Sequence, residues 1–343
     1  MSPAISPLPR TIDWSVDHAV LIDQTLLPGE LVLARIDTVD AMIDAIKRLV
    51  VRGAPAIGVA GALGVAIASL AADRRGDSDR LQVHADADRL AVARPTAVNL
   101  SWAVNRMRPV VDSGSAAVVA AAVEILEEDV ATQEALGRRG AALVRQLVTR
   151  EKIRVHTHCN AGGLACVLWG TALGVVRALH EEGSLDSVLA DETRPLLQGA
   201  RLTAYELAAM GIDYRVTLDS AGASAIRLGL VDCVVIGADR IAANGDVCNK
   251  VGSYPLALAA ARAGIPFIVA APESSVDVNT PNGNAIEIEE RSHDEVLSYA
   301  GIRTAPLGAK AWNPAFDVTP ADLVTAIVTE QRVIRPAGGE RLD

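Results

Sequence analysis

The sequence predicts an α/β protein in which a small, mostly helical N-terminal domain precedes a doubly wound parallel sheet. Apolar residues with helical spacings of three and four dominate from residue 38 to about residue 149. From Lys152 onward, short strand-like runs alternate with apolar helical segments, which is the pattern of βαβ units. Right-handed crossovers wind such units into a sheet with helices on both faces. We therefore expect domains at residues 1–149 and 150–343.

The N-terminal domain is expected to begin with a short β hairpin and to continue as helices. Polar and β-branched residues alternate before Pro28-Gly29, where the hairpin ends. One helix follows from Thr38, and another spans residues 54–72. These 19 residues carry no charge but include eight Ala and three Gly, so we expect a tightly packed helix and no membrane span. Residues 73–88 are charged and irregular, which predicts a loop or poorly packed helix ends.

The C-terminal domain is expected to contain strands at residues 153–155, 215–218, 231–236 and 266–270. Helices are predicted from about Gly163 and at residues 204–210, 221–228 and 255–263. The chain has neither a GxGxxG nor a GxxxxGK[ST] motif, so we do not expect a dinucleotide site.

The composition excludes some classes of partner. The formal net charge is −10, whereas a nucleic-acid-binding protein needs a basic face. The N-terminus shows no signal-peptide pattern, and the four cysteines form no CxxC pair, which indicates a reduced, cytoplasmic setting. An anionic substrate would have to be held by a few well-placed cations.

A reactive thiol is one reading of Cys159, which follows a predicted strand and precedes a predicted helix within His156–Gly163. The free amides and dipole at a helix N-terminus lower the pKa of a thiol and bind anions. The alternative is a small buried apolar residue. A zinc site from His156, His158 and Cys159 is not expected, because neighbours on a strand point to opposite faces.

Two arginine motifs are candidate phosphate sites. Arg52, Gly53 and Ala54 close one predicted helix and begin the next, where the guanidinium and free backbone amides together suit a phosphate. Arg94 precedes a proline in a similar turn. The alternative for both is a solvated arginine in a loop.

A carboxylate, Asp239, stands directly after the strand at residues 231–236. Ligands of open α/β sheets bind at the carboxyl ends of strands, and apolar surroundings can raise the pKa of such a carboxyl enough for acid or base work. The alternatives are a helix cap or a partner for Arg240. Asn249 and Lys250 follow a glycine-broken turn and precede the predicted start of another helix, and Gln198 could bind substrate hydroxyls or be structural.

Six motifs together resemble the methylthioribose-1-phosphate isomerases. They are RGAPAIGVAGALG, RPTAVNLSWAVNRM, HTHCNAGGLA with WGTALGVVRAL, ETRPLLQGARLTAYEL, IGADRIAANGDVCNKVGSYPLALAA and NPAFDVTPADLVTAIVTE. They occur in the family's order and extend the resemblance from about Trp14 to Glu330.

The resemblance implies the conversion of 5-methylthioribose 1-phosphate into 5-methylthioribulose 1-phosphate in methionine salvage. It implies a Rossmann-like second domain, Cys159 and Asp239 as the catalytic pair, and a homodimer that works without metal or nicotinamide. The implied substrate-binding residues are Arg52, Gly53, Ala54, Arg94, Gln198, Asn249 and Lys250.

Two kinds of alternative remain at this point. A related isomerase could act on ribose 1,5-bisphosphate or 5-deoxyribose 1-phosphate, although the sequence shows no spare basic cluster near the motifs for a second phosphate. The regulatory subunits of the eukaryotic initiation-factor exchange complex share the scaffold, and they bind partners without turnover. The presence of Cys159 and Asp239 argues against that second reading.

Overall fold

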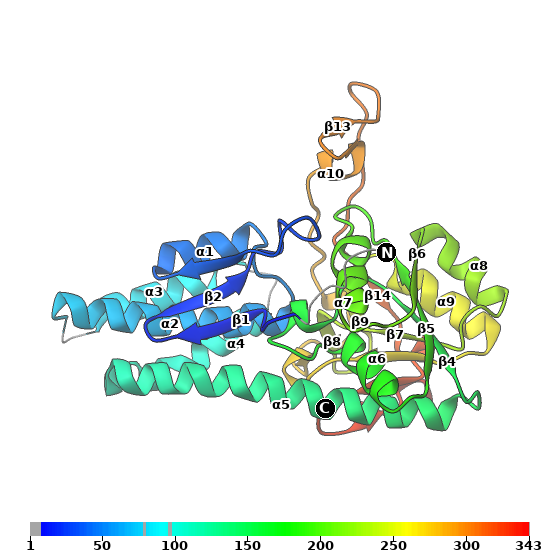
Figure 1. Ribbon diagram of the computed structural model, residues 1–343, viewed down its shortest axis with the longest axis horizontal. Helices are drawn as coiled ribbons and strands as arrows, with labels where there is room; N and C mark the ends of the chain where they lie inside the picture. The colour runs from blue at the N-terminus through cyan, green and yellow to red at the C-terminus, as the bar shows by residue number, and fades with distance from the viewer. Residues whose placement is uncertain (1–7, 78–79, 95–97, 343) are drawn as a thin grey trace.

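The computed structural model describes residues 8–77, 80–94 and 98–342. A largely helical N-terminal part lies beside a C-terminal part built on a seven-stranded sheet (Figure 1). The predicted α/β class is therefore confirmed.

The main sheet has the strand order β16-β15-β10-β7-β4-β5-β6. All neighbouring pairs are parallel except β15 with β16. The strands are β4 (Ile153–Thr157), β5 (Leu185–Asp191), β6 (Tyr214–Thr217), β7 (Cys233–Ile236), β10 (Phe267–Ala270), β15 (Ala326–Val328) and β16 (Val333–Ile334).

The winding of this sheet reverses between β4 and β7. The chain runs from β4 outward through β5 and β6, and then returns to place β7 on the other side of β4. Val155 of β4 pairs with Cys233 of β7. Connections that leave two adjacent strands in opposite directions open a crevice at their carboxyl ends, where ligands of such sheets bind.

Helices cover both faces of the sheet, as the alternation of buried side chains in β7 illustrates. Cys233 and Val235 belong to the core that contains α6 (Ala172–Glu181) and the C-terminal half of α5 (Ser115–Leu147). Val234 and Ile236 belong to the opposite core. That core contains α8 (Gly222–Arg227) and α9 (Ser253–Ala263). Side chains of one strand point alternately to its two faces, so a strand buried on both sides carries a continuous apolar run.

The N-terminal part surrounds one apolar helix. Helices α1 (Val39–Lys47), α3 (Leu81–Ala91), α4 (Val98–Met107) and the first half of α5 pack with α2 (Ala54–Arg75) in one core. Among the described residues, α2 alone is long and apolar enough to cross a membrane. However, 78% of its most apolar window is buried inside the protein, as in the core helix of a folded domain.

Helix α5 joins the two parts, because its buried residues up to Leu126 belong to the N-terminal core and those from Leu136 onward belong to a core of the main sheet. The domain boundary at residues 149 and 150 stays a prediction.

Three smaller sheets complete the fold. Strands β1 (Ile12–Ser15), β2 (His18–Ile22) and β3 (Leu33–Ile36) are antiparallel, so the predicted hairpin has a third strand beyond Pro28-Gly29. A four-stranded sheet has the order β11-β8-β9-β14. Its strands are β11 (Val276–Asp277), β8 (Arg240–Ala242), β9 (Val247–Lys250) and β14 (Phe316–Thr319).

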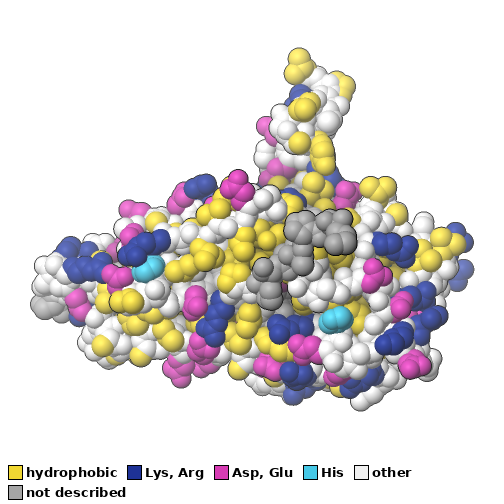
Figure 2. All heavy atoms as spheres, in the orientation of Figure 1, with side chains coloured by type: hydrophobic (Ala, Val, Ile, Leu, Met, Phe, Trp, Pro, Cys, Tyr) yellow, Lys and Arg dark blue, Asp and Glu magenta, His cyan; other side chains and the backbone are white. Residues whose placement is uncertain are grey.

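An arm projects from the C-terminal part and carries α10 (Asp294–Leu297) with the pair β12 (Ser298–Tyr299) and β13 (Ile302–Arg303) (Figure 1). Apolar side chains are exposed along it (Figure 2). The largest exposed fractions are 92% for Leu307, 80% for Trp312 and 70% for Ile302.

Residues 73–88, expected as a loop or poorly packed helix ends, hold the end of α2 and the first part of α3, which packs through Val83 and Ala87. One predicted helix start is wrong. No α-helix starts at Gly163, where there is only a 3-10 turn, Gly163–Ala165, and α6 begins at Ala172. This loop is tied to the N-terminal part instead, since the Thr11 hydroxyl donates to the Gly163 carbonyl and the Gln24 amide to the Leu164 carbonyl.

Strand β5 was not predicted, because Asp186 and Ser187 interrupt its apolar run. The predicted helix at 204–210 is present as α7 (Ala204–Ala209).

The two glycines that flank α2 differ in what surrounds them. Both have positive φ, 93° at Gly53 and 75° at Gly76. A Cβ at Gly53 would lie 2.5 Å from the Ala165 backbone, whereas a Cβ at Gly76 would have nothing within 4 Å. At Gly53, therefore, the backbone of the N-terminal part lies too close to the loop after β4 to leave room for a side chain.

We predict that Gly76→Ala lowers the free energy of unfolding by about 1–2 kcal/mol, the cost of a left-handed alanine. Gly53→Ala should cost at least about 1 kcal/mol more, because the Ala165 backbone must also move. Urea unfolding of both variants measures the difference. Equal losses would show that the contact with Ala165 is loose.

Candidate active site

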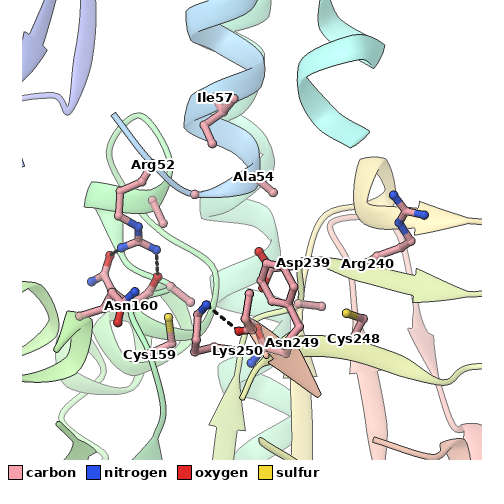
Figure 3. A pocket seen from close by; sticks show the side chains of 18 of the residues that line it. Arg52, Ala54, Ile57, Cys159, Asn160, Asp239, Arg240, Cys248, Asn249 and Lys250 are labelled. Carbon is pink, nitrogen blue, oxygen red and sulfur yellow. Dashed lines mark hydrogen bonds between the residues drawn. The ribbon is translucent and has the colours of Figure 1, made fainter. Parts of the chain in front are cut away.

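A cavity of about 300 Å³ opens at the reversal of the sheet. Its walls come from the loops after β4 and β7, from β9, and from the segment that begins α2 (Figure 3). All nine residues that the sequence predicted as site residues line it: Arg52, Gly53, Ala54, Arg94, Cys159, Gln198, Asp239, Asn249 and Lys250. The fold thus brings together residues from its N-terminal and C-terminal parts. The individual roles of these residues stay predictions.

The backbone of Cys159, two residues beyond β4, is held in an unusual conformation. Its φ is 61°, in the left-handed region that L-residues rarely adopt. The Cys159 N–H donates to the Thr193 hydroxyl at 3.0 Å, and its carbonyl accepts from the Thr203 hydroxyl at 2.6 Å. Such conformations persist where the surroundings fix them, and they cluster at functional sites.

The prediction that the pKa of the Cys159 thiol is lowered is wrong in both direction and cause. No α-helix begins beside it, so no helix dipole lowers the pKa of its thiol. Burial instead raises that pKa, against the opposing effect of the positive charges of Arg52 and Lys250. The thiol is therefore mostly protonated until another group in the cavity takes its proton.

Asp239 lies three residues beyond the end of β7 and faces the same cavity (Figure 3). The two structural alternatives for Asp239, a helix cap and an ion-pair partner for Arg240, are excluded. The next element is strand β8, so Asp239 caps no helix, and Arg240 instead lies 3.7 Å from Asp277. Burial raises the pKa of Asp239, as predicted. However, the surroundings are not simply apolar, because Lys250 and Arg94 oppose the shift.

Lys250 projects between Cys159 and Asp239 (Figure 3). It ends strand β9, and Asn249 lies in the same strand. The helix expected to start after them is present as α9, which begins at Ser253. The Lys250 ammonium donates to the Ala315 carbonyl at 2.7 Å and lies 4.5 Å from the Phe316 ring centroid. Burial lowers the pKa of Lys250.

The arginines of the cavity are fixed differently. The Arg52 guanidinium donates to the side-chain oxygen of Asn160 at 2.5 Å and to its backbone carbonyl at 2.7 Å, which aims it along the cavity wall (Figure 3). Burial lowers the pKa of Arg94, and Asp239 opposes the shift. Arg52, Arg94 and Lys250 make the cavity locally positive within a negatively charged protein, which suits a phosphate.

Two amides of the cavity differ in what they offer a ligand. Gln198 is 8% exposed, and its side-chain carbonyl oxygen has no hydrogen-bond partner in the described structure. An unpaired buried acceptor is costly, and a ligand hydroxyl would satisfy it. The Asn249 amide already donates to the Ser253 hydroxyl at 2.8 Å.

Two further arginines of the cavity were not predicted as site residues. Arg240 and Arg291 also line the cavity, although the sequence showed no spare basic cluster. Both are compensated, Arg240 by Asp277 and Arg291 by Glu289 and Glu295. Arg291 stands in a charged run far along the chain, and no signal in the sequence links it to the site.

Beneath Cys159 lies a buried hydrogen-bond network. The Asp191 carboxylate contacts His156 at 2.9 Å and His158 at 2.8 Å. In the described residues, His158, Asp191 and Asp219 form the only group spaced to hold a metal ion. Their atoms are already engaged, since His158 also contacts the Val251 carbonyl and Asp219 accepts from the Thr193 and Arg194 amides. This network is better suited to supporting the loop that carries Cys159 than to binding a metal ion.

Comparison with known proteins decides the family. The model of the initiation factor 2 subunit family matches residues 50–336. A methylthioribose-1-phosphate isomerase from Alkalilimnicola ehrlichii is 48% identical over 335 residues, 96% of this chain and 95% of that protein. The chain belongs to the initiation factor 2 subunit family. It groups with the methylthioribose-1-phosphate isomerases, as the six motifs predicted.

Another relative is longer than this chain. A probable bifunctional methylthioribose-1-phosphate isomerase/methylthioribulose-1-phosphate dehydratase from Nocardia farcinica is 53% identical over 324 residues. The match covers 94% of this chain but only 59% of that protein.

Two solved structures have the same fold. The 5-methylthioribose 1-phosphate isomerase of Pyrococcus horikoshii OT3 has a TM-score of 0.89 and 40% identity, with 96% of this chain and 94% of that chain covered. A protein from A. fulgidus described as translation initiation factor eIF-2B, subunit delta, has a TM-score of 0.85 and 41% identity, with 96% of each covered.

The charges around Cys159 predict its reactivity. Because only the thiolate reacts, the pH midpoint of its alkylation by iodoacetamide should lie above that of a free thiol, about 8.5. Lys250→Met should raise the midpoint further by removing a cation that favours the thiolate, whereas Lys47→Met on the exposed surface of α1 should not. Labelling of Cys159→Ser gives the background. A midpoint below that of a free thiol would contradict the assignment.

Proposed function

We propose that this protein isomerises 5-methylthioribose 1-phosphate to 5-methylthioribulose 1-phosphate in methionine salvage. The observation that carries the proposal is the position of Cys159 and Asp239 at the ends of the two strands between which the sheet reverses. Membership of the family adds the reaction named for its relatives.

The first step that we propose is ring opening by Asp239. The anomeric oxygen carries the phosphate, so the ring cannot open by losing a hydroxyl proton as an ordinary aldose does. Asp239, whose pKa is raised by burial, donates its proton to the ring oxygen while the bond from that oxygen to C1 breaks and leaves its electron pair on the oxygen. The resulting positive charge at C1 is stabilised by the oxygen that bears the phosphate.

Hydrogen then moves from C2 to C1 by one of two routes. In a hydride shift, the hydrogen carries its electron pair to C1 while the C2 hydroxyl loses its proton to the Asp239 carboxylate, and Cys159 lines the path. In the other route, a deprotonated Cys159 takes the C2 proton, and the electron pair of that bond forms a C1–C2 double bond that neutralises C1. The resulting thiol then protonates C1 while the C2 hydroxyl loses its proton to the Asp239 carboxylate and becomes the ketone oxygen. Deuterium placed at C2 distinguishes them, because it is retained at C1 in the first and exchanges with water in the second.

Binding is assigned to the rest of the set. Arg52, Arg94 and Lys250 would hold the phosphate by charge, while Gln198 and Asn249 would bind the hydroxyls. Gly53 and Ala54 would supply backbone amides at the start of α2.

The substrate alternatives differ in charge at C5. A second phosphate, as in ribose 1,5-bisphosphate, needs cations to spare, and the carboxylates paired with Arg240 and Arg291 reduce what those two residues offer. A methylthio group or the hydrogen of 5-deoxyribose 1-phosphate needs only apolar contacts, such as Ile57 and Ile286 in the wall. The methylthio sugar therefore fits better than the bisphosphate.

A second candidate is a non-catalytic regulatory protein, which is favoured by the similarity to a protein described as an initiation factor subunit. A regulatory protein does not need an acid and a thiol on opposite sides of a positively charged cavity. We therefore place it second.

We further propose a cytoplasmic homodimer with domains at residues 1–149 and 150–343. The exposed apolar side chains of the arm support a contact between subunits there, because large apolar patches on a soluble protein are ordinarily covered.

Catalysis by the pair predicts that Asp239→Asn and Cys159→Ser each lower kcat by about 10²–10⁴-fold, the usual contribution of general acid–base groups. Turnover is measured as ketose formation from each of the three sugar phosphates. Substrate affinity, measured by calorimetry, should stay within about threefold, since neither group is assigned to hold the phosphate.

Asp186→Asn, an exposed substitution on β5, is the matched control and should keep full activity. Near-normal turnover by either folded variant would remove that residue from the mechanism. Turnover of the bisphosphate alone would reject the methylthio sugar, and no turnover of any substrate would favour the regulatory candidate.

The proposed homodimer predicts a solution mass of twice the 35.8 kDa of one chain in light scattering. Leu307→Asp should raise the dissociation constant, because it puts a charge on the arm. Val16→Asp, at a site 91% exposed on the N-terminal part, should not. A mass of one chain for the unaltered protein would reject the dimer, and equal behaviour of the two variants would place the contact away from the arm.

A further inference from the structure

A second cavity, of about 380 Å³, lies between the N-terminal helices and the C-terminal part. Helices α2, α4 and α5 form one side, and residues 272–274 and 330–331 form the other. Its volume falls within the range of about 300–1,000 Å³ that small-molecule sites occupy. None of the nine predicted site residues lines it, although Pro55 and Pro272 belong to the walls of both cavities.

Two buried amides in its wall each leave an acceptor unused. Asn99 is 2% exposed and Gln133 is 1% exposed. The Asn99 amide donates to the Ser274 hydroxyl at 3.0 Å, and the Gln133 amide donates to the Asp129 carboxylate at 3.0 Å. These bonds fix the amides through their nitrogens, and both carbonyl oxygens have no partner in the described structure. Because an unpaired buried acceptor is costly, the wall favours a ligand that donates hydrogen bonds.

The charged side chains of the wall are mostly acidic. Four carboxylates, Glu128, Asp129, Glu273 and Glu330, face one arginine, Arg106. Arg106 is bound to Glu128, and Glu273 is bound to Arg332, which lies outside the wall. In the described structure, the carboxylates of Asp129 and Glu330 form no ion pair, although Arg139 donates to the backbone carbonyl of Glu330. Burial raises the pKa of Asp129 to about 6 despite hydrogen bonds from Gln133 and Val167, so a cation beside it would favour the ionised form.

We propose that this cavity binds a small organic ammonium ion, whose N–H groups donate to Gln133, Asn99 and Asp129. An ammonium supplies both things that the wall lacks, donors for the two amide oxygens and a positive charge for the carboxylates. A neutral polyol would supply only the donors.

A metal ion does not fit this wall. The one group of metal-spaced His, Cys, Asp or Glu side chains found in the described residues is His158, Asp191 and Asp219, and none of these lines the second cavity. The carboxylates of the second cavity are therefore too dispersed to share one metal ion, whereas an organic cation of several atoms can reach more than one of them.

The test uses butane-1,4-diammonium as the probe and butane-1,4-diol as its neutral counterpart, in calorimetry at about 0.15 M salt, which screens exposed charges. We expect the diammonium to bind and the diol not to bind. Gln133→Met keeps the length of the side chain but removes the acceptor, so it should weaken binding by about tenfold or more, as for the loss of one hydrogen bond to a charged group. Gln146→Met, exposed on the same helix α5, should leave the affinity unchanged.

Glu330→Gln provides an independent variant, because it removes a charge from the opposite wall with little change of shape and should also weaken binding. No binding of the diammonium to the unaltered protein at about 10 mM would overturn the proposal. The proposal would also be overturned if both variants bound the diammonium as tightly as the unaltered protein does, or if the diol bound as tightly as the diammonium. The readout is affinity alone, so the result stands whether or not the protein turns over a sugar phosphate.

Discussion

The reversal of the main sheet between β4 and β7 is the constraint on which the site depends. Parallel pairing fixes the two strands side by side, and their outgoing loops leave in opposite directions. Cys159 and Asp239 stand on these two loops, so the distance across the cavity is set by backbone hydrogen bonds and not by flexible side chains. A site built on adjacent strands is held to the tolerance that proton transfer requires.

The N-terminal part closes this crevice from outside the sheet. Gly53 approaches the Ala165 backbone so closely that no side chain fits between them, and Arg52 is anchored on Asn160, directly after Cys159. The loop after β4 therefore serves two functions at once. It carries the thiol, and it docks the helical part that supplies two of the three cations assigned to the phosphate.

The sequence predicted the class of the fold and identified nine residues that line one cavity, because both predictions depend on local patterns. Apolar alternation and helical spacing are local, and strand-end residues such as Asp239 are identified by what precedes them. Contacts between distant segments were not predictable in the same way. The helix expected at Gly163 is absent because Thr11 and Gln24 hold that loop, and those residues are about 140–150 positions away.

Long-range contacts also explain the other omissions. Strand β5 was missed because its polar residues are compensated by tertiary burial of the rest of the strand. Arg291 was missed because only the path of the arm brings it back to the cavity. The second cavity is invisible in the sequence, since Asn99, Gln133 and Glu330 share no motif and meet only where the two parts of the fold touch.

The positive charge of the active-site cavity has opposite effects on binding and on catalysis. Arg52, Arg94 and Lys250 favour a phosphate, but the same charges favour the ionised form of Asp239, which could then donate no proton. Such charges act strongly on a buried carboxyl, because the effective dielectric constant inside a protein is lower than that of water. A bound phosphate dianion offsets much of this field, and burial by the substrate adds to the desolvation of Asp239. If the proposed reaction is correct, substrate binding therefore itself raises the pKa of Asp239, and the acid is protonated at the moment when its proton is needed.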